Sequence, residues 1–270
     1  MIGKFQIRSL RVIFARIRIK LAQNIAACIP FGSRFCCYCK KSSPYFLPYK
    51  SGTKGMPTLM QNLNVIGSDV DNHTCPKCGS HDRERHLKLY LNASLLGAIV
   101  RGKKVLHFAP ESKFSKHIQM AEPKLYIQAD LYPISKDVLC VDLMSTTFED
   151  ATFNLVIANH VLEHVSNVST ALNEIHRILT VNGFALLQVP YSTVLTKTFE
   201  DEGIVTPEAR LQAYGQEDHV RLFGRDIIHF IESFGFEAKV RRHQDNLIDC
   251  DASLHGVNMH EPLFLFKAIK

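Results

Sequence analysis

Residues 153–190 read FNLVIANHVLEHVSNVSTALNEIHRILTVNGFALLQVP, and this stretch decides the fold. It begins and ends with apolar runs of strand length, FNLVIAN and FALLQVP. Between them, VSTALNEIHRILT repeats its apolar residues at helical spacing, and Asn182-Gly183 predicts the end of that helix. Near-continuous apolar strands separated by a helix indicate a parallel sheet that helices cover on both faces.

The same alternation extends in both directions along the chain. We predict further strands in 103–109, 124–131, 138–143, 236–243 and 262–269, and further helices in 111–121 and 226–235. The sequence therefore predicts an α/β fold with a doubly wound, Rossmann-like sheet.

Ligands of such a sheet bind beyond the carboxyl ends of its strands. The candidates at these ends are His107 to Glu111, Asp130, Asp142, Asn159 and His160. Asp130 follows Glu111 by 19 residues, close to the spacing at which an acidic residue binds the hydroxyls of a ribose. A lone Asp is also a common turn cap, so the spacing favours a nucleoside ligand without requiring one.

The loop after the first of these strands contains no glycine, since residues 105–111 read VLHFAPE. A pyrophosphate needs glycine there, because the backbone must approach it closely and present a helix N-terminus. Pro110 removes one amide donor, and Glu111 repels phosphate. S-adenosylmethionine has a ribose, an adenine and a cationic sulfonium but no phosphate. The loop therefore disfavours NAD and FAD and is compatible with S-adenosylmethionine.

The N-terminal quarter of the 270-residue chain is far more basic than the rest. The net charge is +6, but residues 1–68 contain 11 of the 32 Lys and Arg residues and none of the 26 Asp and Glu residues. This asymmetry predicts an anionic partner such as nucleic acid, membrane lipid or a phosphorylated substrate. With 46% hydrophobic residues, the chain can otherwise form an ordinary globular core.

Residues 1–30 form a basic amphipathic segment. Arg and Lys interrupt every apolar run in it, which excludes a signal-peptide core and a membrane span. On a helix, an apolar stripe and a basic stripe separate, which suits a helix lying on an anionic membrane. A helix that docks its apolar stripe on the protein explains the pattern slightly better, and a strand is also compatible.

Four of the eight cysteines form two C-x-x-C pairs, Cys36 with Cys39 and Cys75 with Cys78, separated by 35 residues. Each pair can present two thiolates to one ion, so the set predicts a structural zinc site in a ribbon-like module over 31–80. Cys37 is an alternative to Cys36. Without a secretory signal, we expect a reducing, cytoplasmic compartment, which disfavours disulfides. Two pairs outside a strand-to-helix context also disfavour a redox site.

The block 153–190 resembles class I S-adenosylmethionine-dependent methyltransferases of the type 11 group. CPKCGSHDRERHL, VLHFAPE, ADLYP, NHVLEHV and AYGQEDHVRLFGRD are similar to a bacterial subgroup with an N-terminal zinc knuckle, associated with surface-polysaccharide gene neighbourhoods. The resemblance covers roughly residues 75–270. It implies a methyltransferase domain, which we place at 81–270, with an antiparallel last strand.

The resemblance also implies roles for individual residues. The implied cofactor contacts are His107, Phe108, Ala109 and Glu111 for the methionine part, Asp130 for the ribose, Asp142 and Leu143 for the adenine, and Asn159 and His160 near the methyl group. The sequence departs from the family pattern in the loop 107–111, where the usual acidic residue and glycines are replaced.

Residues 160–164, HVLEH, also match the H-x-x-E-H pattern of a zinc peptidase. Two histidines at that spacing chelate zinc only from one face of a helix. Because His160 directly follows an apolar strand, we expect it in a turn, which disfavours the peptidase.

A second polar cluster lies in 206–224, a region that covers the acceptor pocket in this fold. In one interpretation, His219 is a general base for an acceptor hydroxyl, His160 is a second catalytic candidate, and Arg221 and Tyr191 bind the acceptor. In an equally weighted interpretation, these residues form a satisfied network that fixes a lid loop.

We therefore expect methyl transfer from S-adenosylmethionine to a small-molecule or surface-glycan acceptor, with contact at the inner face of the membrane through the basic segment. The alternative is an RNA-binding protein or RNA methyltransferase that grips phosphates with its ribbon and basic segment. Few aromatic residues interleave with the basic ones for base stacking, which disfavours RNA. A non-catalytic cofactor-binding protein is a third interpretation.

Overall fold

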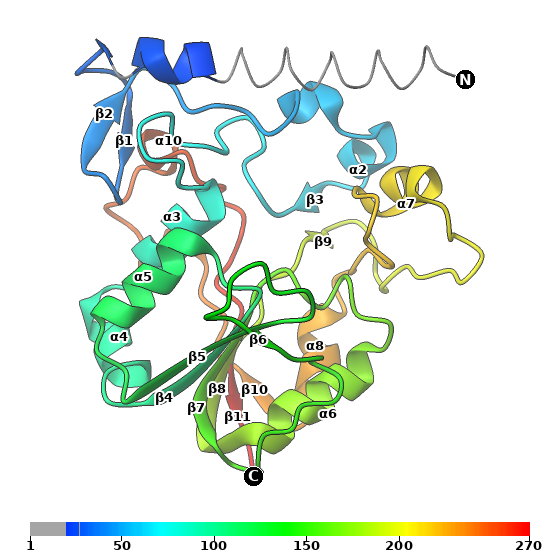
Figure 1. The fold of residues 1–270 in the computed structure, drawn as a ribbon. Helices are drawn as coiled ribbons and strands as arrows, with labels where there is room; N and C mark the ends of the chain where they lie inside the picture. The colour runs from blue at the N-terminus through cyan, green and yellow to red at the C-terminus, as the bar shows by residue number, and fades with distance from the viewer. Residues whose placement is uncertain (1–19, 27) are drawn as a thin grey trace.

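A computed structural model describes residues 20–26 and 28–270, and its centre is a mixed seven-stranded sheet (Figure 1). Most of the predicted basic amphipathic segment 1–30 lies outside the described residues. Within the described part of this segment, residues 20–26 are helical. In the described part of the chain, no helix is long and apolar enough to cross a membrane.

The sheet has the strand order β10-β11-β8-β7-β4-β5-β6. Its strands are β4 (Lys104–Phe108), β5 (Leu125–Asp130), β6 (Leu139–Cys140), β7 (Phe153–Ala158), β8 (Leu179–Leu186), β10 (Phe236–Ala238) and β11 (Leu265–Ala268). The strands from β4 to β8 pair in parallel, whereas β11 is antiparallel to both β8 and β10. The predicted doubly wound α/β fold with an antiparallel last strand is confirmed.

Consecutive residues of the central strands point into two separate cores, because side chains alternate across a sheet. Val105 packs with α3 (Asp82–Tyr90), α4 (Ala93–Ile99) and α5 (Ser112–Met120). Leu106 packs with α6 (Val168–Ile178) and α8 (Ile227–Glu232) on the other face. Figure 1 shows α4 and α5 to the left of the sheet and α6 and α8 to the right.

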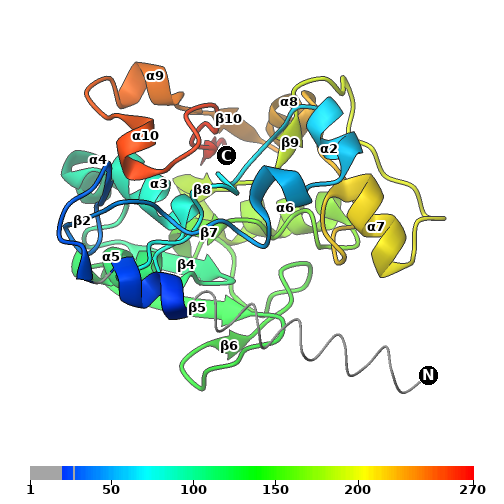
Figure 2. The same ribbon diagram turned by 90° about the horizontal axis from the view of Figure 1, so that it is seen from above.

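The N-terminal segment forms a layer above the sheet in Figure 1. Its elements are β1 (Arg34–Cys36), β2 (Lys41–Ser43), the 3-10 helix η1 (Gly52–Gly55), α2 (Thr58–Asn62) and β3 (Val65–Ile66). β3 pairs with β9 (Tyr191–Ser192), and α2 lies beside α7 (Pro207–Tyr214) in both views (Figures 1 and 2). Met60 of α2 is buried against Tyr214 and Leu222. This segment therefore shares a core with residues 206–224, the predicted lid region.

The chain between β10 and β11 reaches back to this layer. It contains α9 (His243–Asn246) and α10 (Ala252–His255). Arg34 of β1 donates a hydrogen bond from Nη1 to the carbonyl oxygen of Ser253 at 2.7 Å. The C-terminal quarter thus holds the N-terminal hairpin against the sheet domain.

The predicted boundary between α6 and β8 was wrong. The helix ends at Ile178, and β8 begins at Leu179 instead of Phe184. β8 pairs with β7 at Leu179 and again from Phe184, so the residues between them bulge out of the pairing. Asn182 lies in this bulge with a φ of +59°, a conformation that Asn tolerates better than most residues. The turn signal therefore marked a bulge inside the strand.

Candidate active site and metal centre

The two C-x-x-C pairs come together at one point, as their spacing predicts. The Sγ atoms of Cys36 and Cys78 are 3.6 Å apart, and those of Cys39 and Cys75 are 4.0 Å apart. Sulfurs that bind one tetrahedral zinc ion at about 2.3 Å are separated from each other by about 3.8 Å. The four thiols therefore fit a zinc ion with no ligand position left open.

Cys37 lies outside this cluster. Its thiol donates to the carbonyl oxygen of Arg85 at 3.8 Å, and burial raises its pKa to about 12. Because zinc binds the thiolate, Cys37 is a poor ligand in this environment. Cys36 completes the set, and Cys37 does not replace it.

The carboxyl ends of three strands lie side by side at the upper edge of the sheet. Phe108 of β4 pairs with Ala129 of β5 and with Ala158 of β7. The next residue of each strand, Ala109, Asp130 or Asn159, therefore stands at the same edge. Ala109 has a φ of +46°, in the region that glycine favours. The loop thus keeps the backbone conformation of a glycine-containing loop although it has no glycine.

Glu111 is held at this edge by two neighbours. The buried His107 donates from Nε2 to Glu111 Oε2 at 2.9 Å, and its Nδ1 contacts the Tyr126 hydroxyl at 2.8 Å. Asn159 Nδ2 lies 3.5 Å from Glu111 Oε1. Burial would raise the pKa of Glu111, but the hydrogen bond and charge of His107 lower it overall. Glu111 is therefore anionic at neutral pH, and the hydrogen bond from the buried His107 side chain fixes the position of its carboxylate.

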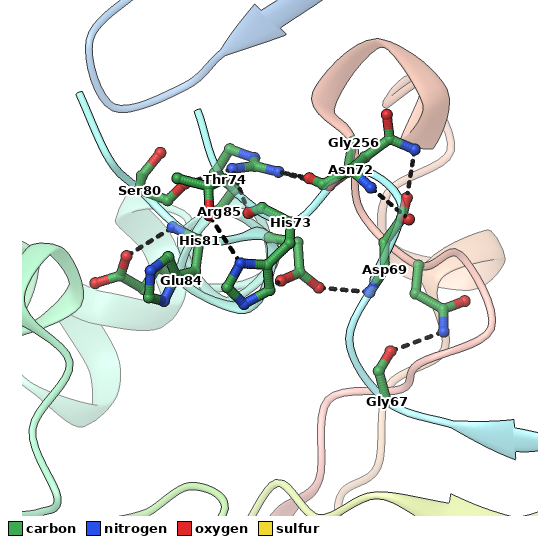
Figure 3. Close-up of polar contacts among 12 residues, drawn as sticks. Gly67, Asp69, Asn72, His73, Thr74, Ser80, His81, Glu84, Arg85 and Gly256 are labelled. Carbon is green, nitrogen blue, oxygen red and sulfur yellow. Dashed lines mark hydrogen bonds and ion pairs between the residues drawn. The ribbon is translucent and has the colours of Figure 1, made fainter. Parts of the chain in front are cut away.

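The N-terminus of α5, where a dinucleotide would place its pyrophosphate, is already occupied by a protein carboxylate. Glu84 Oε1 accepts hydrogen bonds from the backbone amides of Lys113 at 2.7 Å and Phe114 at 3.4 Å. Its Oε2 accepts from the backbone amide of His81 at 2.9 Å (Figure 3). A phosphate would compete with this buried carboxylate for the same amides. Glu84 was not predicted as a site residue, because its only signal in the sequence is its place three residues after a helix N-cap.

The acidic residues at the sheet edge suit a ligand with hydroxyls and a positive charge. Asp130 Oδ1 accepts from the Tyr132 amide at 2.8 Å, and Asp142 Oδ1 accepts from the Met144 amide at 2.8 Å. Among the described residues, neither carboxylate forms an ion pair, so a second oxygen of each is available to a ligand. This set fits the ribose and sulfonium of S-adenosylmethionine and disfavours phosphate.

Two predicted cofactor contacts are buried in the main core of the domain. Phe108 is 2% exposed and Leu143 is 4% exposed. Both therefore present little side-chain surface to a ligand, and they shape the edge mainly through their packing.

A cavity of about 420 Å³ lies beside this edge. One wall is formed by residues of the N-terminal layer, including Tyr49, Met60 and Val70. A second wall is formed by residues 160–164 and Pro190, which follow β7 and β8, and a third by residues 211–219. The cavity is therefore assembled from the N-terminal segment that carries the cysteine cluster, from the sheet edge and from residues 211–219.

Three polar side chains gather in the cavity wall: Glu163, His164 and His219. One potential ligand atom of each lies within 4.8 Å of the others. His219 is 7% exposed, and its Nδ1 contacts the carbonyl oxygen of Tyr214 at 3.2 Å. That contact requires a proton on Nδ1 and leaves Nε2 as an acceptor. The predicted base candidate therefore faces the cavity.

Burial affects the two partners of this cluster in opposite ways. It would raise the pKa of Glu163, but the hydrogen bond from His160 lowers that pKa overall. Burial lowers the pKa of His219, although the nearby Glu163 carboxylate raises it in part. At neutral pH, the cavity therefore contains a carboxylate beside a neutral imidazole.

His160 also reaches the cavity, from a turn and not from a helix. Its φ is +54°, its amide donates to the Gln188 carbonyl oxygen at 2.7 Å, and its Nδ1 lies 3.2 Å from Glu163 Oε1. The two histidines of HVLEH therefore do not share a helix face, and the peptidase arrangement is absent from this segment.

Arg221 and Tyr191 do not face the cavity. Arg221 is 2% exposed, pairs with Glu200 at 2.9 Å, and donates to the carbonyl oxygens of residues 162, 165 and 166. Tyr191 packs against Phe264 with ring centroids 5.5 Å apart. Arg221 thus fixes the turn after β7, as the lid-network interpretation expects, and we do not propose either residue as an acceptor ligand.

Arg83 is a basic residue of the cavity that was not predicted from the sequence. It projects from α3, is half-buried and lines the cavity. Within the described part of the chain, its guanidinium has no hydrogen bond or ion pair. A cation in this position is available to an anionic group in the cavity.

The comparisons with known proteins agree with this geometry. Residues 101–187, from β4 to β8, match the family model described as a methyltransferase domain. The chain contains a methyltransferase domain. The methyltransferase domain is that of an enzyme that transfers methyl groups.

Solved structures similar to the methyltransferase domain include two bacterial enzymes. An S-adenosylmethionine-dependent methyltransferase from Mesorhizobium loti is 14% identical, with a TM-score of 0.41, and the match covers 67% of this chain and 98% of that one. The 1,6-didemethyltoxoflavin-N1-methyltransferase of Burkholderia thailandensis, solved with 1,6-didemethyltoxoflavin and S-adenosylhomocysteine, is 14% identical with a TM-score of 0.44. That match covers 66% of this chain and 76% of that one. No curated protein matches the chain.

Proposed function

We propose that this methyltransferase acts on a small-molecule or glycan acceptor that binds in the cavity between the N-terminal layer, the sheet edge and the lid. The observation that carries the proposal is the meeting of two sites at the end of β7. Asn159 contacts Glu111 on the cofactor side, and the next residue, His160, lines the cavity. An acceptor in the cavity would thus lie next to the cofactor.

The residues at the edge bind and orient the cofactor in this proposal. When bound, S-adenosylmethionine supplies an electrophilic methyl group on a positively charged sulfur. Asp130 binds the ribose hydroxyls through its free carboxylate oxygen, and Asp142 lies near the adenine. Glu111, kept anionic by His107, faces the positive charge. These groups are held by the protein before the cofactor arrives, so little ordering accompanies binding.

The cavity residues orient the acceptor. Binding two reactants side by side is the main contribution that such an enzyme makes to the rate. In the simplest version, the free Nε2 of His219 accepts a hydrogen bond from an acceptor hydroxyl. Arg83 faces the same space and would pair with an anionic group of the acceptor.

Size and shape favour a compact acceptor over RNA. A volume of about 420 Å³ is typical of small-molecule pockets. Sequence-specific RNA recognition instead uses aromatic platforms for unstacked bases, and in the described N-terminal layer only Tyr49 and His73 offer an aromatic ring to the cavity. We also propose that the basic N-terminal segment contacts a membrane that carries a lipid-linked glycan acceptor.

We expect Val70→Trp to block methyl transfer without weakening cofactor binding, because the larger side chain fills the cavity away from the strand edge. With S-adenosylmethionine labelled in its methyl group, label transfer to low-mass and lipid-linked glycan fractions should fall at least about tenfold, a barrier increase of about 1.4 kcal/mol. Cofactor affinity should change less than about twofold, or about 0.4 kcal/mol.

The matched control is Val181→Trp, which places the same side chain on an exposed part of β8 where Val181 is 60% exposed. This variant should transfer label as the wild type does. Label that appears in RNA, and that Val70→Trp leaves unchanged, would contradict the proposed acceptor class.

A further inference from the structure

We infer that Glu163, His164 and His219 bind a divalent transition-metal ion in the cavity wall, separate from the four-cysteine site. The ion has open positions toward the cavity, where it would hold an oxygen atom of the acceptor. This second statement rests on the proposed function, whereas the metal site itself does not.

The three side chains come from two segments that the fold brings together. Glu163 and His164 lie in the turn after β7, and His219 lies in the lid region. The backbone amide of Val220 donates to the carbonyl oxygen of Glu163 at 3.0 Å, which fixes the lid to the turn beside the site. The ligand atoms lie within 4.8 Å of one another. Ligands at about 2.1 Å from one zinc ion are about 3.4 Å apart, so the side chains need to close by at most about 1.4 Å.

The strongest observation is an unpartnered carboxylate oxygen. Glu163 is 1% exposed, and its Oε1 contacts His160 Nδ1 at 3.2 Å. Its Oε2 is buried and has no hydrogen-bond partner. A buried carboxylate oxygen without a partner carries a large desolvation penalty. A cation between Glu163 and the two histidines would remove that penalty.

Both histidines are oriented as metal ligands are. His164 Nδ1 lies 3.3 Å from Asp218 Oδ2, and His219 Nδ1 lies 3.2 Å from the carbonyl oxygen of Tyr214. Histidines that bind metals usually donate their other ring N–H to a carboxylate or a backbone carbonyl, which fixes the ring and the tautomer. In each ring, Nε2 is left for the ion.

Two imidazoles and one carboxylate form a ligand set that zinc and iron(II) accept with positions left open. This set differs from the H-x-x-E-H arrangement, because His160 serves as the partner of Glu163 and His219 takes its place. An ion here would bind an acceptor hydroxyl or carboxylate and lower the pKa of a bound hydroxyl. His219 would then be a metal ligand and not the general base.

Zinc content of the full-length protein tests the inference. The wild type, equilibrated with zinc and then freed of excess ion, should hold two zinc ions per chain, one in each site. Glu163→Gln and His219→Ala should each hold one. In a zinc titration against a competing indicator, Asp218→Asn should weaken the second ion about tenfold, because it loses the charge that orients His164.

The control variant is His229→Ala, which removes a histidine that is 89% exposed in its side chain and should leave two ions bound. The zinc ion of the cysteine site reports that each variant is folded. One zinc ion per wild-type chain, or two in Glu163→Gln, would overturn the inference. Binding of S-adenosylmethionine by the same samples separates the claims: binding without a second ion refutes only the metal site, and a second ion without cofactor binding refutes only the proposed function.

Discussion

We expect Arg85→Ala to lower the free energy of unfolding by about 4 kcal/mol, because breaking a buried hydrogen-bond network is one of the few mechanisms that cause losses of this size. The Arg85 side chain is fully buried at the junction of the N-terminal layer and the sheet domain. Its guanidinium donates five hydrogen bonds, all of them to backbone carbonyl oxygens: those of Asn72, His73, Ser80, His255 and Gly256. Figure 3 labels Arg85 and all of these residues except His255. Each carbonyl left without a donor costs about 1–3 kcal/mol, which entry of water would partly offset.

Arg85 also joins segments that are far apart in sequence. The carbonyls that it binds lie in 72–80 and in 255–256, and its guanidinium carbon lies 4.1 Å from the centroid of the Phe46 ring. Arg85→Lys should cause an intermediate loss, because an ammonium cannot reproduce the planar fork of donors.

Chemical denaturation measures both variants, with Arg101→Ala as the control. The Arg101 side chain is 69% exposed, so its removal should change stability by less than about 0.5 kcal/mol. A loss below about 1 kcal/mol in Arg85→Ala would contradict the role assigned to this network.

We expect Cys75→Ser to abolish zinc binding at the cysteine site and to unfold the N-terminal layer. Cys75 is fully buried, and its Sγ lies 4.0 Å from that of Cys39. Because the free energy of binding a structural zinc ion is also free energy of folding, its loss removes the largest single stabilising term of this small layer. The cavity wall formed by Tyr49, Met60 and Val70 belongs to the same layer, so methyl transfer should fall with it.

Metal analysis and differential scanning calorimetry test this expectation. Cys75→Ser should lose one zinc ion relative to the wild type and melt at a lower temperature, and a strong chelator should likewise lower the melting temperature of the wild type. Cys37→Ser is the matched control, since its thiol contacts the Arg85 carbonyl oxygen and not the cluster. Zinc loss in Cys37→Ser, or full zinc content in Cys75→Ser, would show that the ligand set is different.

The fold could be predicted because its signals are local and repeated. Apolar strands and amphipathic helices alternate along the chain, and the carboxyl ends of parallel strands must meet at one edge. The sequence alone therefore places Asp130, Asp142 and Asn159 at that edge. The cysteine cluster could be predicted because two short knuckles with matching spacing have few other uses in a reduced protein.

The details that failed depend on contacts between distant segments. Arg221 has the charge and the hydrogen-bond donors of a substrate ligand, but its carbonyl partners in 162–166 cannot be recognised from the sequence. Glu84 caps a helix that begins 28 residues later, and Arg83 faces a cavity whose walls come from three segments. Periodicity reports which face of an element is buried, but it does not report which residues meet across the core.

The bulge in β8 illustrates the same limit at the level of the backbone. Asn182-Gly183 is a turn signal, and a helix end was the simplest interpretation of it. In the structure, Leu179 already pairs with Phe153 of β7, so the helix ends earlier and the turn lies within the strand. The pairing with a neighbouring strand overrides the local preference.

The central claim is that the glycine-free edge binds S-adenosylmethionine through Asp130. Calorimetric titration with S-adenosylmethionine and with NAD tests it most directly, using the wild type, Asp130→Ala and the exposed control Asp137→Ala. We predict that the wild type and the control bind S-adenosylmethionine and not NAD, and that Asp130→Ala binds it at least about tenfold more weakly, a loss of about 1.4 kcal/mol. Absence of S-adenosylmethionine binding by the wild type, or equal affinity for NAD, would contradict the account.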